Sequence, residues 1–127
     1  MAVIEITTQI GCSVNCAYCP QKVLIPAYKK LGGARTMTLD LLKVYLESVP
    51  IEIEIGFTGM SEPWLNSECT SMVEYVYQKG YKIFIDTTLV GMSMQDIDRL
   101  SKLHFQYFAV HLPTESKYEN ITVDDKY

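Results

Sequence analysis

Three of the four cysteines in this chain lie close together, between residues 11 and 20. Cys12 and Cys16 are separated by three residues, and Cys16 and Cys19 by two. A thiolate is the form of cysteine that binds metal, and a nearby metal lowers the pKa of the thiol. A short loop with this spacing can therefore present three thiolates to one metal site.

The same three positions would also suit a helix that turns one face toward a core, because they fall at i, i+4 and i+7. Free cysteine is commonly buried as a small hydrophobic residue. Gly11, Asn15 and Pro20 disfavour a helix through all three cysteines. A disulfide is also disfavoured, because clustered cysteines in a reduced compartment more often bind metal or act in catalysis. We therefore interpret the segment as a metal-binding loop.

The residues leave two kinds of metal site open. A structural zinc ion takes four ligands, and the fourth would have to be Cys69, His104 or His111. An iron–sulfur cluster held by three thiolates would instead keep one iron free to bind a small molecule, as a catalytic zinc ion keeps an open position. A structural zinc site would make the chain a zinc-binding interaction module.

Length and composition restrict the class of protein. The chain has 127 residues, of which 48% are hydrophobic and 20% charged, as is typical of one globular domain. The net charge of −4 provides no basic surface for nucleic acid or an anionic membrane. No apolar run approaches the roughly 20 residues that cross a bilayer, and the N-terminus does not resemble a signal peptide. We expect a cytoplasmic protein that binds neither membranes nor nucleic acid.

Strands and helices alternate along the chain and must position the cysteine loop. Residues 2–8 are rich in β-branched side chains and predict a strand that leads directly into the loop. Apolar or alternating patterns predict three more strands, over residues 51–57, 81–87 and 105–112. This alternation predicts a parallel sheet with helices between its strands.

Three helices are predicted between the later strands. The first runs over residues 39–49 after the N-cap Thr38, the second over residues 68–79, and the third begins at a capping box of Ser93 and Asp96. Residues 21–37 contain breakers such as Pro26 and predict an extended loop with one helical turn. The residues after Pro113 are polar and have no clear pattern.

Polar segments follow the other strands at the edge where the cysteine loop lies. These segments are Gly59-Met60-Ser61-Glu62-Pro63 after the second strand, Asp86-Thr87-Thr88 at the end of the third, and His111 with Thr114 at the end of the fourth. A buried amine needs acceptors, which strand-end carbonyls and the Glu62 carboxylate could supply. The alternative roles are structural: a turn for Glu62, a cap for the threonines and a hydrogen-bonded histidine at 111.

The motif Cys-x3-Cys-x2-Cys, with the aromatic Tyr18 just before the last cysteine, resembles the cluster loop of radical S-adenosylmethionine (SAM) enzymes. The segment ending in Glu62-Pro63 resembles the family's Gly-Gly-Glu segment, although Met60 and Ser61 replace the adjoining glycines. The resemblance implies a [4Fe-4S] cluster bound by three ligands, with SAM on its open iron. The implied metal ligands are Cys12, Cys16 and Cys19.

The resemblance also implies which residues contact the cofactor. The segment Gly59, Met60, Ser61 and Glu62 would receive the amino group of the SAM methionine. Thr87 and Thr88 would lie near the cofactor or substrate, His111 near the ribose, and Tyr18 beside the cluster or adenine. Cys69 is expected to be a buried structural thiol.

The activity implied by the resemblance is reductive cleavage of SAM to methionine and a 5'-deoxyadenosyl radical, which abstracts hydrogen from a small-molecule or peptide substrate. A low-potential electron donor would be required. The implied fold is a partial (β/α) barrel of six units, of which this chain matches the first four. We therefore expect residues 1–127 to be the N-terminal portion of a truncated core domain. The alternative within the same fold is a non-catalytic remnant.

Overall fold

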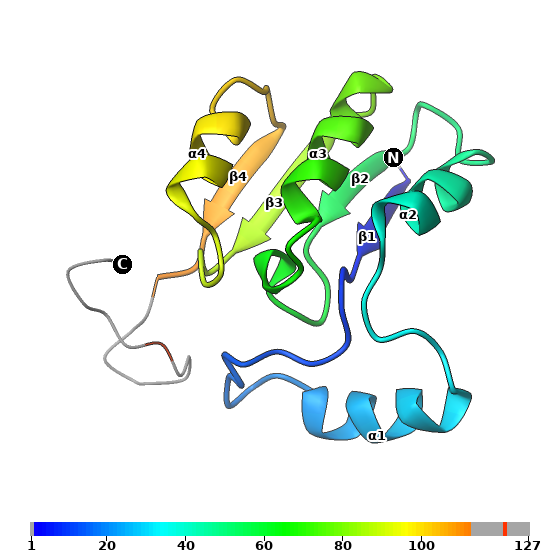
Figure 1. The fold of residues 1–127 in the computed structure, drawn as a ribbon, viewed down its shortest axis with the longest axis vertical. Helices are drawn as coiled ribbons and strands as arrows, with labels where there is room; N and C mark the ends of the chain where they lie inside the picture. The colour runs from blue at the N-terminus through cyan, green and yellow to red at the C-terminus, as the bar shows by residue number, and fades with distance from the viewer. Residues whose placement is uncertain (1, 113–120, 122–127) are drawn as a thin grey trace.

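The computed structural model describes residues 2–112 and residue 121. Four strands form one sheet in the order β1-β2-β3-β4, and each neighbouring pair is parallel (Figure 1). The strands are β1 (Val3–Ile6), β2 (Glu54–Phe57), β3 (Ile83–Thr87) and β4 (Tyr107–Val110). The predicted parallel sheet is confirmed. The predicted polar segment after Pro113, and Thr114 within it, lie outside the described residues.

Three helices cover one face of the sheet: α2 (Leu39–Leu46), α3 (Cys69–Gln78) and α4 (Met94–Leu100) (Figure 1). The predicted caps at two of these helices are confirmed. The Thr38 side chain accepts a hydrogen bond from the Leu41 amide, and Ser93 and Asp96 form a reciprocal capping box. Each cap satisfies amide groups that the first helical turn leaves without a partner.

The hydrophobic core lies between the helix layer and the sheet. Strand side chains alternate between the two faces, so Ile55 and Phe57 of β2 point into the core. Leu42 and Leu46 of α2 contribute from the helix side. Tyr45 of the same helix is 57% exposed, because Leu42 and Leu46 define the side of α2 that is buried.

Helix α1 (Gln21–Leu31) corrects the predicted extended loop. Pro26 lies inside it and removes the hydrogen bond that its amide would have made to the Lys22 carbonyl. Both residues are exposed, so water can replace the missing partner. The residues around Pro26 are mostly good helix formers, and Gly32 ends the helix in the left-handed conformation, with φ of 69°. Gly32 therefore acts as the C-cap of α1 rather than as part of a loop.

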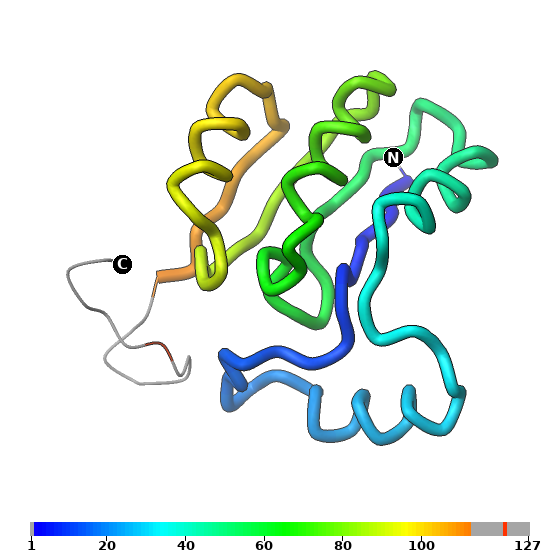
Figure 2. Tube along the Cα trace, in the orientation of Figure 1, coloured from blue at the N-terminus to red at the C-terminus, as the bar shows by residue number. Residues whose placement is uncertain are grey.

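Figure 2 shows the path of the chain from β1 through the cysteine loop and α1 and back to α2. Helix α1 lies beyond the carboxyl ends of the strands, apart from the helix layer (Figure 1). Among its residues only Gln21 is buried. Among the described residues, no helix has the length and apolar character needed to span a membrane.

Candidate functional site

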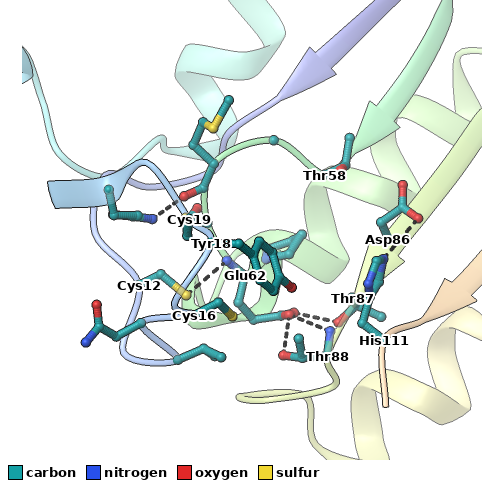
Figure 3. A pocket seen from close by; sticks show the side chains of 17 residues that line it. Cys12, Cys16, Tyr18, Cys19, Thr58, Glu62, Asp86, Thr87, Thr88 and His111 are labelled. Atoms are coloured by element: carbon teal, nitrogen blue, oxygen red, sulfur yellow. Dashed lines mark hydrogen bonds and ion pairs between the residues drawn. The ribbon is translucent and has the colours of Figure 1, made fainter. Parts of the chain in front are cut away.

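The segments that follow the strands surround one hollow at the carboxyl edge of the sheet (Figure 3). This is the edge where α/β proteins commonly bind ligands. All the residues that the sequence singled out for cluster or cofactor contacts line it. They are Cys12, Cys16, Tyr18, Cys19, Gly59, Met60, Ser61, Glu62, Thr87, Thr88 and His111. The fold thus brings together segments that are far apart in sequence, while the role of each residue remains a prediction.

The cysteine loop is not a helix. Asn15 has a positive φ of 49°, a conformation that asparagine tolerates better than most residues and that breaks a helix. A turn follows, closed by the Cys19 amide donating to the Cys16 carbonyl at 3.1 Å. Buried packing of the three cysteines on one helical face is therefore wrong. All three cysteines are of intermediate exposure.

The three thiols lie on one side of the hollow (Figure 3). Within residues 2–112 and residue 121, no group of three or more His, Cys, Asp and Glu side chains converges as the ligands of a single metal ion would. A zinc ion needs such convergence, because all of its ligands lie about 2.0–2.3 Å from one point. In a [4Fe-4S] cluster each thiolate binds a separate iron, so its ligands do not have to converge on one point.

Glu62 occupies the centre of the hollow's wall and is only 5% exposed. Its carboxylate accepts hydrogen bonds from the Thr87 hydroxyl at 2.5 Å and from both the amide and the hydroxyl of Thr88 at 2.7 Å. The Trp64 amide approaches the same carboxylate at 3.4 Å. Glu62 therefore links the segment after β2 to the end of β3. The structure excludes the alternative of an exposed turn residue.

The backbone of Glu62 connects this segment to the cysteine loop. Its amide donates to Cys12 Sγ at 3.4 Å (Figure 3). One residue therefore contacts both parts of the site that the sequence identified separately.

The segment from Gly59 to Asn66 is fixed to the residues that follow β1. The Met60 amide donates to Thr7 Oγ1 at 3.2 Å, and Thr8 Oγ1 donates to the Pro63 carbonyl at 2.9 Å. The Asn66 side-chain amide donates to the carbonyls of Thr8 at 3.0 Å and Met37 at 2.8 Å. Gly59 has φ of 89° and lies directly against Thr7, so a side chain does not fit there. These contacts preform the segment without any ligand.

Two buried side chains in the lining each have a polar atom without a hydrogen-bond partner among the described residues. These atoms are Gln21 Oε1 and Ser61 Oγ. Gln21 is 4% exposed and Ser61 9%. The Gln21 side-chain amide group donates to the Met60 carbonyl. Sequence reasoning missed Gln21, because the helix that it begins was predicted as a loop. Its position two residues after Cys19 was the only available signal.

His111 and Asp86 form the side of the hollow nearest β4. His111 Nε2 lies 3.6 Å from Asp86 Oδ1, which makes an ion pair when the imidazole is protonated. The His111 amide donates to the Thr87 carbonyl at 2.8 Å, which extends the pairing of β3 and β4 to the edge of the hollow. Asp86 and Thr58 also line the hollow, although sequence analysis assigned neither of them a specific role.

Cys69 does not belong to this lining. It is fully buried in the hydrophobic core at the start of α3. Burial raises the pKa of its thiol well above the ordinary value, and the charges of Glu62 and Asp96 raise it further. This environment agrees with the expectation from the sequence that Cys69 is a buried structural thiol.

No family model and no curated protein matches this sequence. Two crystal structures of BtrN, a radical SAM enzyme, are similar in fold, each with 22% sequence identity. BtrN in complex with AdoMet and 2-DOIA has a TM-score of 0.58 and matches 86% of this chain and 44% of its own. SeMet BtrN in an open conformation has a TM-score of 0.60, and the match covers 92% of this chain and 53% of the BtrN chain.

This chain thus spans about half the length of the BtrN chains. At this level of identity the likeness concerns the fold. It confirms the α/β fold class that the sequence predicted: the four-stranded parallel sheet and its helices are similar in fold to BtrN.

Proposed function

We propose that this chain is a radical SAM enzyme, or part of one, in which Cys12, Cys16 and Cys19 hold a [4Fe-4S] cluster. The observation that carries the proposal is the meeting of the cysteine loop and the segment from Gly59 to Glu62 in one hollow. The hollow lies at the carboxyl edge of a parallel sheet whose fold resembles BtrN. One BtrN structure contains AdoMet, which is SAM, and this supports SAM as the ligand here.

The residues of the chain fit both cofactors. Three half-buried cysteines on one lining suit an iron–sulfur cluster, and the Glu62 amide would donate to one cluster ligand, Cys12. Hydrogen bonds to cluster sulfurs are among the features that set a cluster's reduction potential. Buried polar atoms on Gln21 and Ser61 leave hydrogen-bonding capacity for a polar ligand. When bound, the cluster would supply the electron that cleaves SAM and so generates a radical able to remove hydrogen from a substrate.

The remaining parts of the proposal concern partners and location. We propose a small molecule or a peptide as the substrate and a low-potential electron donor as the redox partner. We also propose a cytoplasmic location, as expected from the sequence. We further propose that residues 1–127 form the N-terminal portion of the core domain, with other residues completing the cofactor site.

Anaerobic reconstitution with iron and sulfide tests the cluster. The wild-type chain should bind about four irons and four sulfides, and Cys16→Ala should lose the cluster. Cys69→Ala is the matched control: it removes a thiol from the core and should retain the wild-type iron content. Stoichiometric zinc without iron in anaerobically prepared protein would favour a zinc-binding interaction module instead.

SAM cleavage by the reduced, reconstituted chain tests the enzymatic part of the proposal. Formation of 5'-deoxyadenosine in the presence of a strong reductant supports an enzyme. A stable cluster that produces none, both in this chain and in a longer chain with a complete barrel, would indicate the non-catalytic remnant.

A further inference from the structure

The acceptors that the sequence assigned to a ligand's amino group are already used by the protein. A carboxylate has about four lone-pair positions. Those of Glu62 receive four donors: the hydroxyls of Thr87 and Thr88 and the amides of Thr88 and Trp64. The Met60 carbonyl receives the side-chain amide group of Gln21. A bound amine would have to break one of these bonds to reach either acceptor.

Two other acceptors belong to residues of the same lining and are not used by the protein. Gln21 Oε1 and Ser61 Oγ are buried and have no hydrogen-bond partner among the described residues. A buried polar atom without a partner costs free energy, and a ligand donor that reaches it removes that cost. The two residues come from different segments, the start of α1 and the loop after β2, and both border the hollow. They flank the Met60 carbonyl, to which the Gln21 side chain is bonded.

The charges around the hollow favour a cationic ligand. Its lining contains the carboxylates of Glu62 and Asp86, and no lysine or arginine among the described residues that form it. His111, the remaining titratable base of the lining, faces Asp86. Three thiolates, once bound to a cluster, would add further negative charge on the opposite side.

We propose that Gln21 Oε1 and Ser61 Oγ are the protein's acceptors for the amino group of the bound ligand. The inference depends on the proposed function, in which that ligand is the sulfonium cation SAM. An amino group held through its nitrogen still offers two N–H donors, which matches two acceptors. Glu62 is then a positioning residue: its side chain fixes the segment after β2, and its backbone amide faces Cys12.

Binding measurements on the reconstituted chain with two probes test this assignment. The probes are SAM and the SAM analogue that lacks the α-amino group, each measured by equilibrium dialysis. Ser61→Ala should bind SAM about tenfold more weakly, because it loses a hydrogen bond to a charged or metal-bound donor. Its affinity for the deaminated analogue should be unchanged. Ser101→Ala, which alters a serine outside this lining, should match the wild type with both probes.

Gln21→Met tests the second acceptor. It keeps a side chain of similar length but removes the amide, so the preference for SAM over the analogue should again fall. The loss should be smaller than for Ser61→Ala, because the variant also frees the Met60 carbonyl, which can accept from the amine in its place. Gln78→Met, on the exposed end of α3, is the matched control. Thermal unfolding without ligand checks that each variant folds. The ligand-free melting temperature of Ser61→Ala should be equal to or above that of the wild type, because the variant removes an unpartnered buried hydroxyl.

The outcomes separate the inference from the proposed function. If the wild type takes up a cluster and SAM but both variants keep its full preference for SAM, the assignment is wrong and the proposed function stands. If Glu62→Gln alone removes the preference, Glu62 is the acceptor, as the sequence indicated. If the wild-type chain binds neither a cluster nor SAM, the proposed function fails and the assignment fails with it.

Discussion

The cysteine loop and the segment after β2 form two adjoining sides of one hollow, joined where the Glu62 amide donates to Cys12 Sγ, yet they are held in different ways. The segment after β2 is buried from residue 61 to residue 64 and is bonded to Thr8 after β1 and to Thr87 of β3. In the cysteine loop the thiols are half-exposed and Tyr18 is 63% exposed. The difference indicates that the sheet edge is packed into the fold, whereas the side chains of the cysteine loop stay partly open to solvent.

The largest expected difference between the two sides is in the free energy of unfolding, when a core side chain next to one of them is removed. Phe57, at the end of β2, is fully buried beneath the segment that Glu62 anchors. Phe57→Ala should lower the free energy of unfolding by about 3–5 kcal/mol, because it leaves a cavity in the core. Urea denaturation of the cluster-free chain measures this loss.

Tyr18→Ala removes an aromatic side chain from the other side of the hollow and serves as the control. Because Tyr18 is mostly exposed, its loss should change the free energy of unfolding by less than about 0.5 kcal/mol. Comparable losses in the two variants would show that the cysteine loop is as much a part of the stable structure as the sheet edge.

The same contrast explains how much of the molecule could be predicted from sequence. The parallel sheet and the helix caps follow from local patterns, such as the spacing between Ser93 and Asp96. Short-range signals were sufficient there because the residues that interact are neighbours in sequence. The convergence of the predicted site residues followed from the strand ends, because parallel strands deliver their following segments to one edge.

What the sequence did not reveal depends on long-range contacts or on competing local signals. Pro26 concealed α1, and with it the position of Gln21, because a proline inside a helix is normally a breaker. The four donors on Glu62 lie partly on residues 25 and 26 positions away, and only the folded chain brings them together. The strand predicted from residue 51 begins at Glu54, because a turn with the Ile53 amide bonded to the Pro50 carbonyl precedes it.

A glycine substitution should have the next largest effect and tests how closely the preformed side is packed. Gly59→Ala should cost about 2–3 kcal/mol in the free energy of unfolding. About 1–2 kcal/mol comes from a side chain at positive φ, and the rest from overlap with Thr7. The overlap should also displace the Met60 amide from Thr7 Oγ1 and so weaken SAM binding by the reconstituted chain.

Gly80→Ala is a matched control for that substitution. Gly80 has the same φ of 89°, but a Cβ there would meet only Ile51, at 3.8 Å. It should therefore show the backbone cost alone, and the difference between the two variants measures the close approach of Gly59 to Thr7. Equal losses in both variants would mean that the segment can move away from β1 without cost.

The smallest expected effect lies in the helix layer, far from the hollow. Arg99 of α4 donates to both oxygens of Glu74 on α3, at 2.9 and 2.6 Å, and these bonds lower the pKa of Glu74. A carboxyl group with a lowered folded-state pKa stabilises the fold above its unfolded-state pKa, and the contribution is lost as the pH falls through the folded-state value.

Glu74→Gln should therefore lower the free energy of unfolding by less than about 1 kcal/mol at pH 7, because both side chains are partly exposed to solvent. The difference from the wild type should shrink as the pH falls below the ordinary glutamate value of about 4.5. Denaturation curves at a series of pH values measure it, and the iron content at pH 7 should not change. A difference that grows toward low pH would show that the Glu74 carboxylate destabilises the fold, and a loss of iron would show that the helix layer and the cysteine loop are coupled.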